Sequence, residues 1–464
     1  MFIFILLPLL ITLCYLYFYA KFSFWRDFEV PYCVPRFLVP KYADIQSAYN
    51  EAKREETVIA GTFRVTRPIV IAVHLDVVNQ ILVKDFQNFQ SRSYHQYSNS
   101  EALSLLHQAG GDKWQNLRSR LSSILSSEKM KIIVPTIFHT GDGFNKQLST
   151  LVGERGKIID ITNITKRLTV DIIGDCLFGS KDEFKNEFNK MVIKYSLPEK
   201  EIIGSGGYLS RVTMLKENIA KKFTKLVNET INYKESCTNS HNGNDFMDFM
   251  LELKKEGNLS ETEAISQAFC FAVAGFKSIA YTLSYCLYEL AMNSELQKQA
   301  RVSVKEAILK HNGYTYESIL DMKYLDQCIK ETLRKYPVVP ATSRLVTSDF
   351  YCILKRGMQV LIPTHSIHHD PEYYPKPEIF DPSRFTDEEI AKRPPCSFIP
   401  FGDGPRNCLG NKLAMFQLRI ALTSLLLNFT FHKCEQTAEK LLQAKSIGSS
   451  LKPEKSIYLK MVKL

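Results

Sequence analysis

Cys408 is a potentially reactive residue in a loop rich in glycine and proline. The loop, residues 398 to 410, reads Phe-Ile-Pro-Phe-Gly-Asp-Gly-Pro-Arg-Asn-Cys-Leu-Gly. Glycine adopts unusual backbone angles and proline lacks an N–H donor, so this segment cannot continue as helix or strand. From Leu409 onward the apolar residues follow a helical pattern, which puts Cys408 just before a helix N-terminus. Free N–H groups and the dipole at that end favour an ionised thiolate. A thiolate on a stiff loop is a good axial ligand for haem iron.

A single cysteine is more often a buried packing residue than a ligand, but the residues around Cys408 alter that balance. Six positions match Phe-Gly-x-Gly-x-Arg-x-Cys-x-Gly: Phe401, Gly402, Gly404, Arg406, Cys408 and Gly410. This segment resembles the haem-ligand loop of the cytochrome P450 family. The resemblance implies that haem b is the cofactor and that Cys408 is its iron ligand. It also implies that Phe401, Gly402 and Arg406 help to bind the haem.

A long helical pattern from Ala264 to about Asn293 carries a second set of chemically relevant residues. Residues 274 to 278, Ala-Gly-Phe-Lys-Ser, resemble the family motif Ala-Gly-x-acid-Thr, in which a groove admits dioxygen and the hydroxyl helps to deliver protons. The resemblance implies catalytic roles for Gly275 and Ser278. Lys277 departs from the motif, because a protonated lysine cannot accept a hydrogen bond. A serine hydroxyl that bonds back to its own helix is the ordinary alternative for Ser278.

Three further positively charged or aromatic positions are candidates for haem binding. Trp114 and Arg118 lie four residues apart, so they share one face of a predicted helix. A packing tryptophan beside a solvated arginine is the plain interpretation of this pair. The family resemblance implies instead that Arg118, Arg344 and Arg406 hold haem propionates, with Trp114 supporting them. The planar guanidinium fork is well suited to a carboxylate.

Glu331 and Arg334 are three residues apart on the predicted helix from Tyr324 to Tyr336. An isolated pair with this spacing is usually a surface ion pair of little energetic weight. The surrounding Lys-Glu-Thr-Leu-Arg-Lys-Tyr-Pro resembles the family's Glu-x-x-Arg segment. The resemblance implies that a second arginine, Arg384, joins the pair and that the three brace the haem-binding side without touching substrate.

The rest of the pattern predicts a mainly α protein with a small β region, which is the cytochrome P450 fold implied by the resemblance. Strand-forming runs at residues 57–65 and 68–73 predict a hairpin, followed by a helix over 75–84. Ser260 and Glu263 have capping-box spacing before the long helix. Further amphipathic helical patterns cover 112–136, 160–178 and 212–235.

The first 20 residues carry no charged side chain, and Lys21 and Arg26 follow them. Such a run is long enough to span a bilayer, and the positive-inside rule places the body in the cytosol. A cleaved secretory signal is the alternative, but the basic n-region is missing. We therefore expect an anchor over 1–20, a basic and proline-containing hinge over 21–45, and a catalytic domain over 46–464 on the cytosolic face of the endoplasmic reticulum membrane.

Composition excludes several other classes of protein. The 11 cysteines are scattered without a Cys-x-x-Cys pair, which argues against a disulfide framework or a zinc site. The net charge of +10 is spread over dispersed residues, which argues against nucleic-acid binding and favours membrane lipid or an acidic protein partner. His365, His368 and His369 with Asp370 could suggest a metal site, but no second cluster of suitable spacing accompanies them.

The resemblance implies a haem-thiolate monooxygenase that inserts one oxygen atom from dioxygen into a lipophilic small molecule, a xenobiotic or an endogenous lipid-like compound. The sequence is most similar to insect-type microsomal members, although it is shorter between Cys176 and Leu215. It lacks a Gly-x-Gly-x-x-Gly fingerprint, so the electrons of NADPH require a separate donor. The resemblance implies NADPH-cytochrome P450 reductase, with cytochrome b5 as a second candidate. Basic residues offered for that contact are Lys113, Arg120, Lys129, Lys131 and Lys412.

Two alternatives remain open at this level. One is a haem-thiolate isomerase or dehydratase that needs no reductase, which the altered charge at Lys277 keeps in view. The other is a non-catalytic haem-binding paralogue, which the shortened segment before Leu215 keeps in view.

Overall fold

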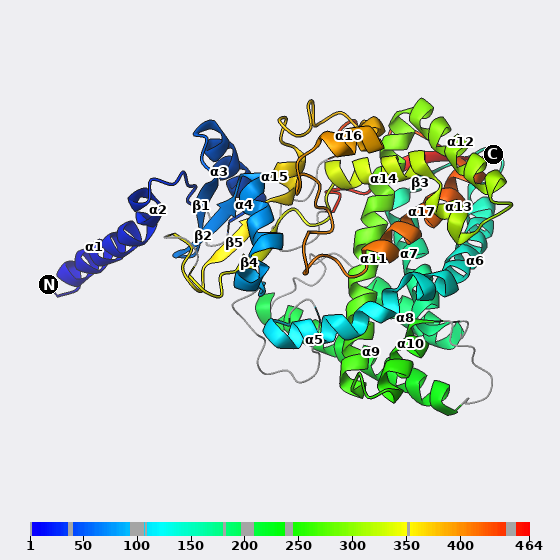
Figure 1. Cartoon of the computed structure of the whole chain (residues 1–464), viewed down its shortest axis with the longest axis horizontal. Helices are drawn as coiled ribbons and strands as arrows, with labels where there is room; N and C mark the ends of the chain where they lie inside the picture. Colours follow the sequence, from blue (N-terminus) through cyan, green and yellow to red (C-terminus); the bar gives the residue numbers. More distant parts are fainter. Residues whose placement is uncertain are drawn as a thin grey trace. The chain divides into compact units, whose positions relative to one another are not determined.

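The computed structural model describes residues 2–35, 40–92, 106, 109–179, 182–195, 208–236, 245–349, 353–441 and 452–464. The chain forms two compact units (Figure 1). The first unit contains Met1–Gln96, Glu331–Cys408 and Gln443–Lys452, and the second contains Tyr97–Lys330, Leu409–Leu442 and Pro453–Leu464. Helices predominate and the sheets are small, so the prediction of a mainly α protein is confirmed.

A four-stranded sheet forms the centre of the first unit, in the order β1-β2-β5-β4. The strands are β1 (Ile59–Arg64), β2 (Arg67–Ala72), β4 (Thr342–Leu345) and β5 (Gln359–Ile362). The predicted hairpin is confirmed, since β1 and β2 pair antiparallel from Ile59 opposite Ala72 to Arg64 opposite Arg67. Strand β5 then runs parallel to β2 and antiparallel to β4. The buried core around this sheet includes Trp25, Tyr49, Phe63 and Val70.

The first unit also contains short helices. They are α2 (Phe24–Asp27), α3 (Tyr42–Arg54), α4 (Leu75–Asn79), α15 (Thr364–His368), α16 (Asp387–Lys392) and the last turn of α14 (Lys323–Lys335), with 3-10 turns at Phe86–Phe89 and Pro382–Phe385. The helix predicted over 75–84 is confirmed, but its second half, Gln80–Lys84, is a π-helix. Such wider turns are often found beside functional segments, and this one contacts the cysteine loop described below.

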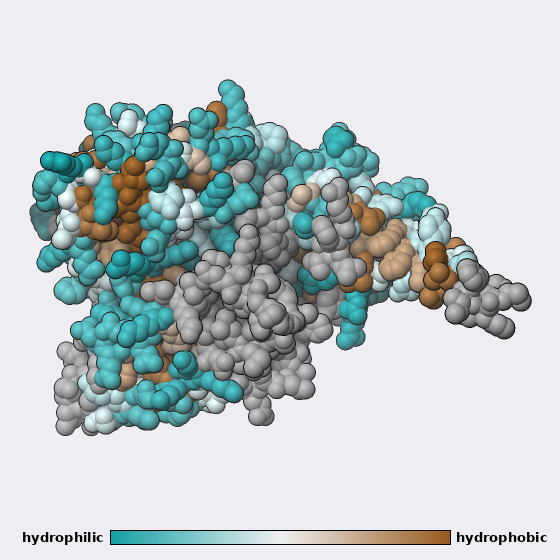
Figure 2. Space-filling view, turned by 180° about the vertical axis from the view of Figure 1, so that it is seen from behind, coloured by the Kyte–Doolittle hydropathy of each residue, from teal (hydrophilic) through white to brown (hydrophobic). Residues whose placement is uncertain are grey.

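The N-terminal helix α1 (Phe2–Phe22) carries an apolar surface. Its leucine and tyrosine side chains from Leu7 onward are exposed, and Figure 2 shows apolar side chains along it. Among the described residues one helix, Glu261–Met292, is long and apolar enough to cross a membrane, and 61% of its most apolar window is buried inside the protein. Because most of this window is buried, Glu261–Met292 is expected to be a core helix of the protein. The apolar stretch Leu7–Phe22 is shorter.

The second unit is a helical body with a small antiparallel sheet. Its helices are α5 (Gly111–Ser122), α6 (Ser127–Val152), α7 (Ile161–Phe178), α8 (Asp182–Tyr195), α9 (Tyr208–Ser236), α10 (Phe246–Lys255), α11 (Glu261–Met292), α12 (Ser294–Lys310), α13 (Tyr316–Leu320), the first part of α14, and α17 (Asn411–Asn428). The sheet has the order β3 (Lys157–Asp160), β7 (Tyr458–Lys463), β6 (Phe429–His432). Helix α11 packs against α7 and α17 through its mostly buried surface.

Helix termini follow local capping chemistry in this unit. Ser260 and Glu263 form the predicted capping box: the Ser260 hydroxyl accepts the Glu263 N–H at 3.2 Å, and the Glu263 carboxylate accepts the Ser260 N–H at 3.0 Å. The continuous helix predicted over 112–136 is wrong, because a 3-10 turn and an extended Ser126 interrupt it. The Ser126 hydroxyl accepts the Lys129 N–H and starts α6 as a new helix.

Candidate active site

Backbone hydrogen bonds within the loop hold Cys408. The Cys408 N–H donates to the Phe401 carbonyl at 2.8 Å, and the Gly402 N–H donates to the Ile399 carbonyl at 3.0 Å. Gly402 and Gly404 have φ angles of 72° and 68°, which are open to glycine at little cost. Cys408 is exposed. The predicted tight loop before a helix is confirmed, since α17 begins at Asn411.

The loop also lies against the π-helix Gln80–Lys84. A Cβ atom added to Gly404 would lie 1.8 Å from the carbonyl oxygen of Leu82, far inside van der Waals contact. Asp403 steadies the same position, because its carboxylate accepts the Gly404 N–H at 2.7 Å. Only glycine fits here without moving the backbone, so Gly404 is required by both its dihedral angle and its surroundings.

Three arginines of the first unit interact: Arg92, Arg344 and Arg406. Arg344 is fully buried and Arg406 is 2% exposed. Arg92 donates to the Arg406 carbonyl at 2.8 Å, and Arg406 donates to the Gln90 carbonyl. Arg344 donates one nitrogen to the Ser343 carbonyl at 3.0 Å, whereas its Nε and Nη2 have no partner among the described residues.

The electrostatics of this cluster suit an anion. Burial, together with the smaller effect of the positive charges of Arg92 and Arg406, lowers the pKa of Arg344 to about 9. A buried cation with donors to spare, beside two more cations, is costly unless a negative group neutralises it. A carboxylate, such as a haem propionate, matches the planar guanidinium donors. Sequence reasoning missed Arg92, because a lone arginine in a loop carries no periodic or motif signal.

In the second unit, Trp114 and Arg118 meet as predicted. Trp114 on α5 is 4% exposed, and the guanidinium carbon of Arg118 lies 6.0 Å from its ring centroid. This distance allows a weak cation–π contact. The shared helix face is therefore confirmed, and a role toward a propionate stays a prediction.

Helix α11 holds Gly275, Lys277 and Ser278 in three different settings. The Ser278 hydroxyl donates to the Ala274 carbonyl at 2.8 Å, which is the intrahelical bond considered as its ordinary alternative. A Cβ on Gly275 would lie 3.0 Å from the side chain of Ile173 on α7, so this glycine allows close helix packing. Lys277 lines a 20 Å³ apolar cavity between α8, α9 and α11.

Glu331, Arg334 and Arg384 lie together in the first unit, and their role as a brace of the haem-binding side stays a prediction. Arg334 binds the Glu331 carboxylate with two nitrogens, at 2.7 and 2.8 Å, and both side chains are fully buried. The Nε of Arg384 lies 3.6 Å from the same carboxylate. Arg334 also donates to the carbonyls of His368 and Pro377, at 2.9 and 2.7 Å. The surface ion-pair interpretation is wrong, because helix α14 buries this pair beneath the 364–385 segment.

The histidines of this segment are structural. Among the described residues, no group of three His, Cys, Asp or Glu side chains is arranged to hold a metal ion. His365 bonds to the Tyr42 hydroxyl and stacks on His369, with ring centroids 3.9 Å apart. His368 accepts the Ile399 N–H through Nε2 at 2.9 Å. Each ring is used for packing or backbone contacts in the first unit.

These histidines make stability depend on pH. Burial lowers the pKa of His365 and His368 well below 6.5 and that of His369 to about 4. Below about pH 6.5 the unfolded chain then binds more protons than the folded chain, so stability falls on acidification towards about pH 4, by at most about 1.4 kcal/mol per pH unit for each histidine. Unfolding at stepped pH tests this, and His369→Gln should reduce the slope. Stability that is unchanged over that range would contradict it.

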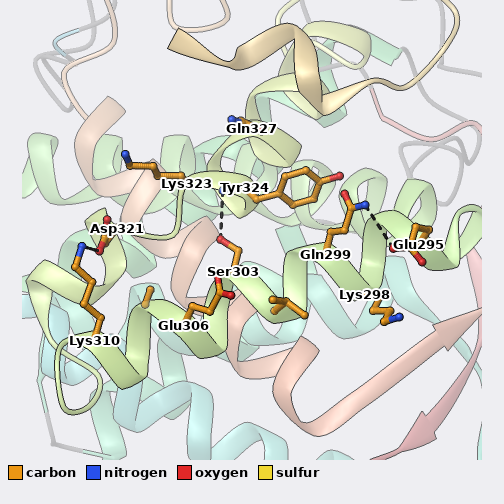
Figure 3. A pocket seen from close by; sticks show the side chains of 12 residues that line it. Glu295, Lys298, Gln299, Ser303, Glu306, Lys310, Asp321, Lys323, Tyr324 and Gln327 are labelled. Carbon is orange, nitrogen blue, oxygen red and sulfur yellow. Dashed lines mark hydrogen bonds and ion pairs between the residues drawn. The ribbon is translucent and has the colours of Figure 1, made fainter.

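A solvent-open groove of 570 Å³ follows α12 and the start of α14 (Figure 3). Side chains of both charges line it, among them Lys298, Glu306, Lys310 and Asp321. Lys310 and Asp321 neutralise each other at 2.6 Å. None of the predicted site residues lines this groove.

The predicted partner-binding lysines and arginine differ in availability. Arg120, Lys129 and Lys131 already pair with Glu263, Glu252 and Glu317, at 3.3, 2.7 and 3.2 Å. Lys113 and Lys412 are exposed, and in the described part of the chain they make no ion pair. Lys113 and Lys412 are therefore more available than the other three residues for contact with an acidic partner.

Comparison with known proteins agrees with this arrangement. The profile of the family described as Cytochrome P450 matches residues 29–461. Probable cytochrome P450 6a23 of Drosophila melanogaster is 35% identical over 501 aligned positions, covering 99% of this chain and 98% of the relative. Cytochrome P450 6a2 of the same organism is 31% identical, covering 100% of this chain and 99% of the relative.

The alignment with the first of these relatives is longer than the 464 residues of this chain, so that relative has segments that this chain lacks. The match nevertheless extends over nearly the whole of both proteins. The chain therefore belongs to the cytochrome P450 family, the haem-thiolate monooxygenases.

Proposed function

We propose that Cys408 ligates the iron of haem b and that the protein inserts one oxygen atom from dioxygen into a lipophilic xenobiotic or endogenous lipid-like compound. One observation carries the cofactor assignment: Arg344 is fully buried, yet Nε and Nη2 have no partner among the described residues. Buried cations are retained where an anion completes their bonding. The nearby loop with Cys408 supplies a thiolate ligand in the same unit.

The proposed cofactor residues act by binding and orientation. Arg344, Arg406 and Arg92 would donate to the propionates, and the same role is proposed for Arg118, with Trp114 supporting it. Phe401 and Gly402 shape the backbone that holds the Cys408 N–H. When bound, haem supplies a redox-active iron for the activation of dioxygen. Glu331, Arg334 and Arg384 keep the loop side rigid and do not contact substrate.

Proton delivery is assigned to α11. The Ser278 hydroxyl donates to the Ala274 carbonyl at 2.8 Å and keeps its oxygen lone pairs available to accept a proton-bearing group. A water held there could exchange its proton through this oxygen. The small side chain of Gly275 is proposed to leave room for dioxygen. The ammonium of Lys277 can only donate, so it cannot replace an acidic relay residue.

The membrane arrangement is proposed from the N-terminal segment. Residues 1–20 would anchor the chain in the endoplasmic reticulum membrane, 21–45 would form the hinge, and 46–464 would be the catalytic domain facing the cytosol. Exposed apolar side chains on α1 support this proposal. NADPH-cytochrome P450 reductase is proposed as electron donor and cytochrome b5 as a second partner, with Lys113 and Lys412 as their contacts.

Reduction by two donors tests this function. Membranes containing the protein are reduced by NADPH with the reductase, or by dithionite, and carbon monoxide difference spectra are recorded. A thiolate-type Soret band with both reductants, together with an NADPH-dependent oxygenated product from a lipophilic substrate panel, is expected. A band with dithionite alone and no such product would contradict the proposal and favour the reductase-free isomerase or the non-catalytic paralogue.

Arg344→Met is expected to have opposite effects on stability and on haem binding. It removes a buried cation with unpaired donors, so the haem-free protein should gain about 1–3 kcal/mol of unfolding free energy. Haem affinity should fall about tenfold or more, because a charge-assisted bond of about 1.5–3 kcal/mol is lost. Chemical unfolding of the haem-free chain and haem titration measure the two effects.

Arg301→Met is the matched control, because Arg301 donates to the Leu426 and Phe429 carbonyls at 2.7 and 3.1 Å. Its removal should destabilise the chain and leave haem affinity unchanged. Destabilisation of the haem-free protein by Arg344→Met, with unchanged haem affinity, would contradict the assignment.

A further inference from the structure

His368 joins the brace to the cysteine loop. It is the last residue of α15 and is fully buried. Its carbonyl accepts Arg334 Nη1 at 2.9 Å, and its ring Nε2 accepts the Ile399 N–H at 2.9 Å. His368 therefore contacts both the Glu331–Arg334 pair and Ile399, at the start of the cysteine loop.

The contact at Ile399 continues directly to Cys408. The Ile399 carbonyl accepts the Gly402 N–H at 3.0 Å, and the Phe401 carbonyl accepts the Cys408 N–H at 2.8 Å. The Ile399 peptide thus positions the turn that contains Phe401, whose carbonyl holds the Cys408 backbone. Movement of Ile399 would be transmitted to Cys408 through these two hydrogen bonds.

Neighbouring rings fix the orientation of His368. Phe398 stacks on the imidazole with centroids 5.5 Å apart, and Tyr374 meets it edge-on at 6.4 Å. The Tyr374 hydroxyl also donates to the Ser397 carbonyl at 3.2 Å. The ring cannot turn away from Ile399 without disturbing this packing.

The protonation state agrees with an acceptor role. Since Nε2 accepts, the neutral ring carries its proton on Nδ1, and burial lowers the pKa of His368 well below its usual value, so the ring stays neutral. In the described part of the chain Nδ1 makes no hydrogen bond of good geometry, although the Arg334 and Leu333 carbonyls lie close enough to raise the pKa of the ring against the effect of burial. A buried N–H with imperfect hydrogen bonding costs free energy. An apolar side chain of similar size would avoid this cost, so packing alone does not account for a histidine here.

We propose that His368 is a positioning residue whose Nε2 ties the cysteine loop to the Glu331–Arg334 brace. The inference rests on the proposed role of Cys408 as the haem ligand. Its geometric part, the hold on the Ile399 amide, can be measured without haem.

Two substitutions separate the acceptor from the packing. His368→Leu keeps an apolar volume and removes the acceptor, whereas His368→Gln offers an amide oxygen near the position of Nε2. His369→Leu is the control, because His369 is the next residue but contacts His365 through its ring and the His365 carbonyl at 2.9 Å. Each full-length variant is studied by hydrogen–deuterium exchange over the Ile399 amide and by the lifetime of the thiolate-type carbon monoxide band after reduction.

His368→Leu should raise exchange at Ile399 about tenfold and shorten the life of the thiolate-type band severalfold, and His368→Gln should restore both towards wild type. His369→Leu should change neither. Equal effects of His368→Leu and His369→Leu, or wild-type exchange at Ile399 in His368→Leu, would overturn the proposal. If His368→Leu does not fold, exchange in His368→Gln decides, since full loss of protection there rejects the acceptor role. A wild-type protein without a thiolate-type band would instead reject the proposed function, while exchange at Ile399 would still test the hydrogen bond.

Discussion

Glu331→Ala is expected to lower the free energy of unfolding by about 3–5 kcal/mol, because it leaves one buried and one partly buried guanidinium group without their counter-charge. Arg334 is fully buried and uses two nitrogens on this carboxylate, and Arg384 lies 3.6 Å from it. The Asp381 N–H loses its acceptor as well, at 2.9 Å. Chemical unfolding followed by circular dichroism measures the effect, and loss of haem should accompany it.

Glu389→Ala is the matched control, since Glu389 and Lys392 have the same three-residue spacing but are 49% and 68% exposed. Exposed pairs contribute about 0–1 kcal/mol. If both substitutions had the same small effect, the brace would not stabilise the first unit.

Gly404→Ala is expected to destabilise the loop by about 3–5 kcal/mol. The new Cβ would lie 1.8 Å from the Leu82 carbonyl oxygen, so the backbone of the loop or of the π-helix must move. The φ angle of 68° adds a cost for any L side chain. The expected result is a fall in unfolding free energy and a loss of the thiolate-type band.

Gly402→Ala separates these two causes. Gly402 has a similar φ of 72°, but its nearest neighbour to a new Cβ is the Asn407 Cα at 3.8 Å, an ordinary contact. Only the dihedral cost of about 1–2 kcal/mol remains. A Gly404→Ala variant no less stable than Gly402→Ala would show that the close approach to Leu82 is not formed.

Local patterns were sufficient for much of this site. The loop with Cys408 was predictable because glycine, proline, arginine and cysteine occur there at fixed spacing, and the capping box of α11 because its chemistry is local. The roles of Arg92 and His368 were not, since each depends on a contact made across the fold, to Arg406 and to Ile399. The helix break at Ser126 was missed because the amphipathic pattern of side chains continues through this residue, whereas its backbone is extended and ends the helix.

The buried state of the brace shows the same limit. The spacing of Glu331 and Arg334 puts them on one face of α14, but spacing does not reveal whether that face is solvent-exposed. Burial comes from residues 364–385, which pack over this helix face and offer their carbonyls to Arg334. The family resemblance predicted the brace. The structure shows that its Glu331–Arg334 pair is fully buried, which is why its loss is expected to be costly.

Iron ligation by Cys408 is tested most directly by comparing the ferrous carbon monoxide spectrum of Cys408→Ser with that of the wild type. Cys434→Ser is the control. Cys434 is half-buried near Thr437 and lies outside the loop. A thiolate-type Soret band is expected in the wild type and in Cys434→Ser, and it should be completely absent in Cys408→Ser, even where haem remains bound. A thiolate-type band that persists in Cys408→Ser would contradict the assignment of Cys408 as the iron ligand.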